Sequence, residues 1–328
     1  MPVVLSLINL KGGVAKTTTA VQLADTLAFV RGKKVLVLDL DPQTNATLAL
    51  IGEERWAQAD AQGQTLAHLF LDLLGGTRQF DPAAAILPGV SNLGGLVEAG
   101  TGSGGRVDLL PSSIRLIDVQ DRMGDIAART HYAVNPMEVV RQHLSPLFAG
   151  YDYVLIDCPP NLGFVTQNGL EVSDHYLIPT IPDRLSTYGI AQIAGRIAAL
   201  RQARGLRLTC LGVVVTKYQS SSAQHQRGLA RLPGELEAAF GAAGQAPPPV
   251  FKTILPQTNA AAEAMAYERP VTSYPHKYGR TPVGGQPAYR YGLHLAEEIE
   301  TQLSQTLPAR RGGQFSTWLR RMEPGEPA

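Results

Sequence analysis

A short glycine-containing loop near the N-terminus constrains the fold of this chain more than any other segment. An apolar run over residues 3–10 leads into K-G-G-V-A-K-T-T at residues 11–18, and a helical pattern follows. A strand, a glycine-containing loop and a helix in this order form the setting in which backbone N–H groups hold phosphates. Here Lys16 would reach the β- and γ-phosphates of a nucleotide, and the Thr17 hydroxyl would bind Mg²⁺.

The loop departs from the strict phosphate-binding pattern G-x-x-x-x-G-K-[ST] at two positions. Leu10 and Ala15 stand where the pattern has glycine, and an additional lysine, Lys11, precedes the glycine pair. If the backbone at Ala15 has positive φ, alanine costs on the order of 1 kcal/mol relative to glycine. We expect a working loop, because alanine is the smallest side chain that could stand there. Two lysines around one short loop indicate that the loop meets a ligand with more negative charge than one lysine would balance.

The string K-G-G-x-x-K-T-T resembles the deviant Walker A loop of the ParA/MinD family of P-loop ATPases. The resemblance implies that ATP is sandwiched between two chains and that Lys11 reaches the nucleotide of the other subunit. It also implies that the whole loop contacts the nucleotide, namely Lys11, Gly12, Gly13, Val14, Ala15, Lys16, Thr17 and Thr18. Taken alone, the loop could also be a Gly-Lys surface turn.

A second motif joins an apolar strand pattern to a carboxylate-containing loop. Residues 35–38 are apolar, and D-L-D-P-Q-T-N-A-T follows, which begins with Asp39 and contains Asp41. Such a run is typical of a buried parallel strand whose carboxyl end opens onto a ligand crevice. By resemblance this is the switch I region, where Asp41 lies near the γ-phosphate, orients or activates water and helps to place Mg²⁺. Asp39 is equally well explained as an acidic cap on the next element.

A third motif has the same construction. The apolar run over residues 153–156 ends in Asp157, and C-P-P-N-L-G follows. By resemblance this is a Walker B strand, in which Asp157 holds Mg²⁺ through a water, and residues 159–163 are switch II. Cys158 is better explained as a small buried residue than as a redox group. One such string is weak evidence, but three in this order are specific.

The alternation of strand and helix patterns predicts an α/β fold, a doubly wound, mostly parallel sheet with helices on both faces. The expected strands are 3–10, 34–39, 107–110, 153–157, 175–179, 209–215 and 250–254. The expected helices are 16–30, 62–73, 113–129, 136–148, 184–203, 223–241, 257–266 and 288–307. We expect one P-loop ATPase domain over residues 1–307 and a tail over 308–328. By resemblance Thr216 and Pro256 lie on the base side of the nucleotide, whereas the resemblance lapses over 52–106, 219–249 and beyond 307.

Composition limits the classes of partner. The net charge is +1 over 328 residues, so any basic surface for nucleic acid must be local. Two cysteines argue for a reducing compartment, and no run reaches the ~18 apolar residues of a membrane span. We therefore expect a cytoplasmic protein. Because the chain starts at its first expected strand, we expect no N-terminal helix-turn-helix that reads DNA sequence.

Two basic segments are candidate contact surfaces. Residues 274–291 combine tyrosines with positive charge only, which suits a phosphate backbone, and Lys277, Arg280 and Arg290 are the DNA-binding candidates. A surface loop or a dimer contact is the alternative. A second cationic group, which a solvated helix end explains about as well, comprises Arg196, Arg201, Arg204 and Arg207. The tail holds a short basic amphipathic pattern over 310–322, but two following glutamates oppose an anionic membrane, so a membrane is not the expected partner.

Together the motifs and the resemblance predict a ParA-type (Soj-like) ATPase that uses ATP and Mg²⁺ and is weak without a partner. Lys11, Lys16 and Asp41 would be catalytic, and Thr17, Asp41 and Asp157 would hold the metal. An ATP-bound homodimer would bind DNA non-specifically and associate with the nucleoid, and a ParB-like or other cargo adaptor would trigger hydrolysis. The cargo would be a chromosome, a plasmid or a protein assembly. The alternatives are a MinD-like membrane-cycling ATPase and a metabolic P-loop enzyme.

Overall fold

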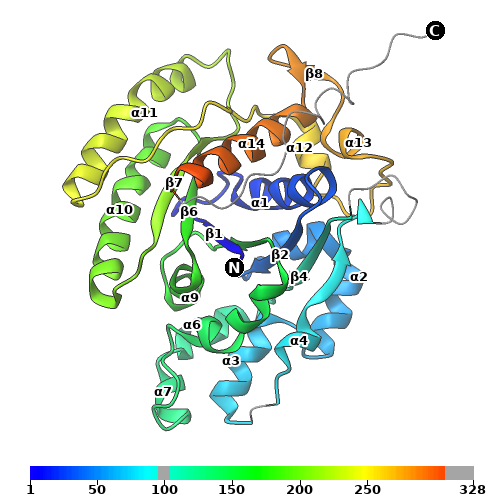
Figure 1. Cartoon of the computed structure of the whole chain (residues 1–328), viewed down its shortest axis with the longest axis vertical. Coiled ribbons are helices and arrows are strands. Elements are labelled where there is room, and N and C mark those ends of the chain that lie inside the picture. The colour runs from blue at the N-terminus through cyan, green and yellow to red at the C-terminus, as the bar shows by residue number, and fades with distance from the viewer. Residues whose placement is uncertain (78, 95–103, 307–328) are drawn as a thin grey trace.

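The computed structural model describes residues 1–77, 79–94 and 104–306, so the expected tail lies outside the described residues. A seven-stranded sheet forms its centre, in the order β3-β4-β2-β5-β1-β6-β7 (Figure 1). All pairings are parallel except that of β3 with β4 at one edge. The predicted α/β fold is confirmed. The strands are β1 (Val3–Leu7), β2 (Lys34–Asp39), β3 (Leu87–Val90), β4 (Arg106–Leu110), β5 (Tyr153–Asp157), β6 (His175–Thr180) and β7 (Thr209–Val215).

Helices cover both faces of the sheet because successive strand side chains point to opposite sides. In β2, Leu36 and Leu38 pack into one core cluster, whereas Val35 and Val37 pack into the other. The first cluster lies under α3 (Leu66–Gly75), α6 (Leu116–Arg122), α7 (Asp125–Arg129), α8 (Val139–His143), α9 (Phe164–Val172), α10 (Arg184–Arg204) and α11 (Ala223–Ala242). The second lies under α1 (Lys16–Asp25), the π-helical turn η1 (Thr26–Val30), α2 (Asn45–Ala61) and α14 (Tyr289–Thr306).

Strand register brings three loops to one edge of the sheet. Leu7 of β1 and Asp39 of β2 both pair with Asp157 of β5. The loops that follow these three strands therefore leave the sheet together at its carboxyl edge, which is the position of ligand crevices in open α/β sheets.

Several predicted elements are corrected by the structure. Residues 250–254 are not a strand: Val250 makes only an isolated bridge to Val213, and the prolines at 247–249 supply no N–H donors to a ladder. The elements β3, α2 and α9 were not predicted from the sequence. Gly52, with φ 73°, interrupts α2, and this break obscures the helical pattern. The expected helix over 113–129 is two short helices, and that over 136–148 is α8 followed by the 3₁₀ turn η3 (Ser145–Gly150).

The C-terminal third adds small elements over the edge of the second face. After β7 and α11 come α12 (Asn259–Glu263), α13 (Tyr274–Tyr278), and a two-stranded hairpin of β8 (Pro282–Val283) and β9 (Gln286–Pro287). A short helix α4 (Pro82–Ala85) precedes β3. None of the helices in the described part of the chain is long and apolar enough to cross a bilayer.

Candidate nucleotide site

The loop between β1 and α1 has the backbone of an anion-binding turn. Gly13 and Ala15 have positive φ values of 76° and 60°, so Ala15 does occupy the left-handed conformation that favours glycine. Helix α1 starts at Lys16, and no side chain caps its N-terminus. Its first N–H groups and the positive end of its dipole are therefore directed at the loop, where they favour a phosphate.

Lys16 brings a buried ammonium group to this loop. Its side chain is 6% exposed, and burial lowers its pKa, while the carboxylates of Asp157 and Asp41 oppose that shift. Its Nζ donates one long hydrogen bond of 3.4 Å, to the carbonyl of Lys11. A buried cation with such a weak bond gains strong charge-assisted hydrogen bonds when a phosphate binds.

Asp157 and Thr17 fit a hard divalent cation. The Thr17 hydroxyl donates to Asp157 Oδ2 at 2.7 Å. The carboxylate is fully buried, and Oδ1 has no hydrogen-bond partner among the described residues. Burial raises the pKa of Asp157 well above its usual range, and the negative charge of neighbouring Asp39 raises it further. An orphaned carboxylate oxygen beside a hydroxyl is the donor type that Mg²⁺ prefers, and a cation would offset the cost of burying the charge.

The metal would not be held by protein alone. No group of three or more His, Cys, Asp or Glu side chains suited to a metal occurs in the described ranges. Mg²⁺ usually keeps several waters and takes one or two carboxylates together with substrate phosphates. Thr17 and Asp157 would therefore hold a cation whose other ligands come from water and the nucleotide.

Asp39 and Asp41 play different parts. Asp39 Oδ2 accepts hydrogen bonds from the N–H and hydroxyl of Thr47, at 2.9 and 2.7 Å, in the first turn of α2. The interpretation of Asp39 as a cap is therefore favoured, and burial raises its pKa to about 7. Asp41 lies two residues further along the chain. Its N–H donates to Asp39 Oδ1 at 3.1 Å, and its carbonyl accepts a hydrogen bond from the Ser112 hydroxyl at 2.7 Å.

Lys11 is paired within its own chain. Its Nζ lies 2.7 Å from Oδ2 of Asp183, in the loop that follows β6. Its N–H donates to Asn9 Oδ1 at 2.9 Å, and the Asn9 amide donates to the carbonyl of Pro179 at 2.8 Å. Neither Asn9 nor Asp183 was predicted as part of the site, because the contacts of Asn9 with Pro179 and of Asp183 with Lys11 join distant segments of the chain.

A cavity of about 270 Å³ continues from the phosphate loop. Four of the residues predicted to contact the nucleotide line it: Ala15, Thr18, Thr216 and Pro256. The Thr216 hydroxyl donates to the carbonyl of Val14 at 2.9 Å, which ties the end of β7 to the loop. Other lining residues, which include Gln22, Lys217, Tyr278 and Tyr291, were not predicted from the sequence to contact the nucleotide.

The DNA-binding candidates separate into buried and exposed groups. Lys277 is fully buried and pairs with Asp25 at 2.7 Å, so its prediction as a DNA contact is wrong. The sequence pattern showed a basic segment, but α13 turns this lysine into the core. Arg280 and Arg290 are exposed, and their contact with DNA stays a prediction.

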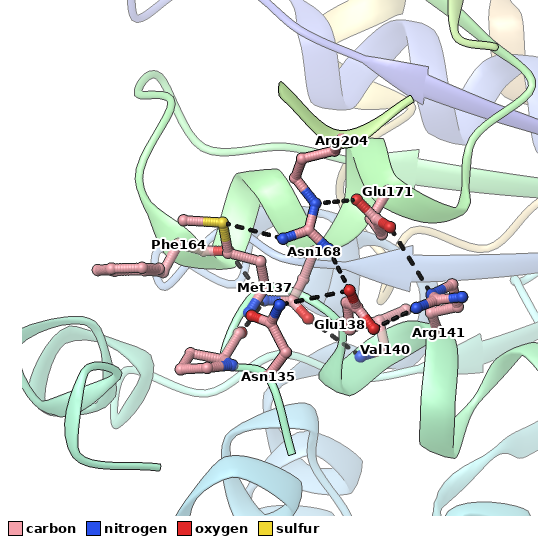
Figure 2. Close-up of polar contacts among 10 residues, drawn as sticks. Asn135, Met137, Glu138, Val140, Arg141, Phe164, Asn168, Glu171 and Arg204 are labelled. Carbon is pink, nitrogen blue, oxygen red and sulfur yellow. Dashed lines mark hydrogen bonds and ion pairs between the residues drawn. The ribbon is translucent and has the colours of Figure 1, made fainter. Parts of the chain in front are cut away.

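Arg204, from the second cationic group, serves a structural network (Figure 2). Its guanidinium bonds Glu171 at 3.0 Å and also Glu138, and Arg141 pairs with the same two carboxylates. These contacts join α10 to α8 and α9. Asn168 of α9 contributes two further hydrogen bonds. Its side-chain amide donates to the carbonyl of Pro136 at 2.7 Å, and its Oδ1 accepts from the N–H of Val140 at 3.1 Å. Arg204 is only 16% exposed, so it adds little to a basic surface.

The chain is similar to known proteins over most of its length. A family model described as an AAA domain matches residues 3–209. The chain is 29% identical over 298 residues to "Chromosome partitioning protein ParA" of Caulobacter vibrioides, covering 90% of this chain and 93% of that protein. It is 29% identical over 271 residues to "Sporulation initiation inhibitor protein Soj" of Bacillus subtilis, covering 83% and 90% respectively.

Solved structures agree with the fold. A "Cobyrinic Acid a,c-diamide synthase from Mycobacterium smegmatis with bound ADP and Magnesium" is 28% identical with a TM-score of 0.58, covering 81% of this chain and 91% of that one. An ATP complex of a McdA variant from Cyanothece has a TM-score of 0.61 over 95% of this chain and 99% of that one. At 19% identity, the likeness to McdA shows the fold alone.

Proposed function

This chain belongs to the AAA domain family, and from that membership and its similarity to ParA and Soj we propose that it is a ParA-type partitioning ATPase. It would hydrolyse ATP with Mg²⁺ and use the nucleotide cycle to position a chromosome, a plasmid or a protein assembly in the cytoplasm. The observation that carries the proposal is the meeting of Lys16, Thr17, Asp41 and Asp157 at the carboxyl edge of the sheet.

Each of these residues has a role that phosphoryl transfer requires. Lys16 and the start of α1 would bind the phosphates and stabilise the charge that grows on them. Thr17 and Asp157 would hold Mg²⁺, which supplies charge neutralisation at the phosphates when bound. Asp41, fixed by Asp39 and Ser112, would accept a hydrogen bond from the attacking water and orient it.

A second lysine supports an ATP-bound homodimer. Lys16 already serves the loop of its own chain, whereas the Lys11 side chain leaves that loop toward Asp183 and is 31% exposed. In a sandwich of two subunits, Lys11 would meet the partner's nucleotide and offset the repulsion between two triphosphates. Hydrolysis would then be slow in the single chain, because the set of charges is complete only when two chains close.

Non-specific DNA binding would follow dimerisation. Arg280, between α13 and β8, and Arg290, in the first turn of α14, are exposed cations, and a dimer would double this modest basic surface. Contacts of this type read the phosphate backbone rather than the bases. A ParB-like or other adaptor on the cargo would stimulate hydrolysis and release the dimer from the nucleoid.

Co-sedimentation tests the proposal in one experiment. The full-length protein is centrifuged with ATP, with ADP and without nucleotide, in parallel with plasmid DNA and with anionic liposomes. We expect binding to DNA only with ATP, no preference for sequence, and a steep loss of affinity as salt rises. Equal DNA binding without nucleotide would contradict the proposal. ATP-dependent binding to liposomes instead would favour the membrane-cycling alternative, whose candidate helix lies outside the described residues.

One comparison favours a second candidate, a metabolic P-loop enzyme. The M. smegmatis structure that carries the name of a diamide synthase is 28% identical to this chain and contains ADP and magnesium. An enzyme of that class would bind and turn over ATP without assembling on DNA. A wild-type protein that hydrolyses ATP as a monomer and never sediments with DNA would support this candidate over the partitioning function.

A further inference from the structure

The ion pair between Lys11 and Asp183 gives Asp183 a role in nucleotide-dependent assembly. We propose that Asp183 is a positioning residue that holds Lys11 against its own chain and so weakens the ATP-bound dimer. The inference rests on the proposed function, because it concerns the lysine that would cross to the other subunit. It adds a residue and a direction of effect: loss of the Asp183 carboxylate should strengthen the dimer.

The pair is short and held from both sides. Lys11 Nζ lies 2.7 Å from Asp183 Oδ2, with side-chain exposures of 31% and 17%. On the lysine side, Asn9 accepts the Lys11 N–H at 2.9 Å and donates to the Pro179 carbonyl at 2.8 Å. Asn9 thus ties the end of β1 to β6, the strand that leads into the Asp183 loop.

The aspartate stands on a loop with little room to move. The Asp183 N–H donates to the carbonyl of Ile181 at 2.8 Å. The carbonyl of the preceding Pro182 packs so closely on Gly228 of α11 that a Cβ at Gly228 would lie 1.9 Å from its oxygen. Asp183 is therefore a fixed acceptor, and Lys11 must leave it in order to bind elsewhere.

The ammonium cannot serve two anions in different places. For Lys11 to reach a phosphate on a second chain, its pair with Asp183 must break, and this happens twice in a symmetric dimer. A partly exposed ion pair of this type is worth up to about fivefold in an equilibrium. Two such pairs would weaken the dimer by roughly two- to thirty-fold, which is enough to delay assembly until ATP and protein are abundant.

The opposite role is also chemically reasonable and gives the opposite sign. If Asp183 instead supported Lys11 in its dimer position, removal of the carboxylate would weaken the dimer. The present geometry favours the restraint, because the lysine is drawn to a carboxylate of its own chain and not extended away from the site.

The test is the dimer dissociation constant of Asp183→Asn, measured by sedimentation velocity with a non-hydrolysable ATP analogue and Mg²⁺. Asp60→Asn is the matched control, because Asp60 is 18% exposed, pairs with Arg115 and lies at the end of α2 away from the site. We expect a dissociation constant roughly two- to thirty-fold lower for Asp183→Asn, the wild-type value for Asp60→Asn, and a value near wild type for Asp183→Glu. An unchanged or higher constant for Asp183→Asn overturns the inference.

A second measurement needs no variant and separates the two proposals. Acetylation of lysines in the nucleotide-free wild-type protein is followed by mass spectrometry at low and high salt. Since salt screens a partly exposed ion pair, Lys11 should react slowly at low salt and faster at high salt, relative to exposed Lys34. Equal salt response of the two lysines contradicts the restraint. If the wild-type protein forms no dimer with the analogue but Lys11 is protected, the partitioning proposal fails, although the Lys11–Asp183 ion pair is present in solution. If the wild-type protein dimerises but the dissociation constant of Asp183→Asn is not lower, the inference fails and the partitioning proposal is unaffected.

Discussion

Lys277 and Asp25 form an ion pair inside the protein. Their charged atoms lie 2.7 Å apart, and neither side chain has exposed surface. The Tyr278 hydroxyl donates to the same Asp25 oxygen at 2.7 Å, and the Lys277 ammonium also lies 3.2 Å from the Ser91 hydroxyl. Asp25 is the last residue of α1, the helix that starts at the phosphate loop. The pair therefore fastens α13, whose Tyr278 lines the base-side cavity, to the nucleotide-binding helix.

Replacing Lys277 by methionine should destabilise the fold by about 3–5 kcal/mol, because it leaves the buried Asp25 carboxylate without its cation. Urea unfolding followed by circular dichroism measures the change. Arg280→Met is the control, since Arg280 is exposed and its loss should change stability by less than about 0.5 kcal/mol. Wild-type stability in Lys277→Met would show that the pair is unimportant to the fold.

Two glycines of α11 predict opposite effects of the same substitution. A Cβ at Gly228 would lie 1.9 Å from the Pro182 carbonyl oxygen, so Gly228→Ala must push α11 away from that loop and should cost about 1–3 kcal/mol. At Gly234 nothing lies within 4 Å of an added Cβ, so Gly234→Ala should stabilise by about 0.5–1 kcal/mol through helix propensity. Thermal unfolding of both variants tests the two predictions, and shifts of the same sign in the two melting temperatures would contradict them.

The parts of the site that the sequence predicted are those whose chemistry is local. Asp157 and the loop around Lys16 each follow an apolar strand directly, so their position at the sheet edge follows from the pattern. The partners of Lys11 and Lys277 could not be predicted in the same way. Lys11 and Asp183 are 172 residues apart, and only the packing of β1 beside β6 brings them together. For Lys277, the positive charge of residues 274–291 predicted a surface position, whereas its pairing with the buried Asp25 carboxylate places it in the core.

The same distinction explains the missed secondary structure. The strand β3 is short, contains Pro88 and Gly89, and gains its place by antiparallel pairing with β4, which no local pattern indicates. Helix α9 is buried on most sides, so its apolar residues do not trace one stripe. Base-side residues such as Tyr291 come from the C-terminal third, where the chain returns over α1.

Acid should weaken the fold partly through His175. Burial lowers the pKa of His175 below its usual 6.5, although nearby Asp174 opposes the shift. The unfolded chain thus binds a proton at this histidine more readily than the folded chain does. The stability that neutral His175 contributes is therefore fully present above about pH 6.5 and is lost as the pH falls toward the pKa of His175 in the folded state. Urea unfolding at pH 7.5 and 5.5 should show a smaller loss of stability in His175→Gln than in wild type. Exposed His131, replaced by Asn, should leave the loss unchanged.

Lys16 and Asp41 should separate binding from turnover. Lys16→Ala removes the ammonium group of the phosphate loop and should abolish ATP binding, measured with a fluorescent ATP analogue. Asp41→Ala leaves the loop intact and should keep ATP binding and ATP-dependent dimers, but slow phosphate release by roughly 10²-fold or more. Hydrolysis by Asp41→Ala at the wild-type rate would show that another group positions the water.

Lys11 should act on the nucleotide of the other subunit. Its ammonium is not needed to hold phosphate in its own loop, where Lys16 and the N-terminus of α1 already serve. Lys11→Ala should therefore leave ATP binding to the single chain largely intact, remove the ATP-dependent dimer, and abolish DNA binding as a consequence. Light scattering of Lys11→Ala and wild type with ATP makes the comparison, and Lys34→Ala, which removes an exposed lysine at the opposite edge of the sheet, is the control. A dimer of undiminished stability in Lys11→Ala would refute the sandwich arrangement and favour the metabolic enzyme.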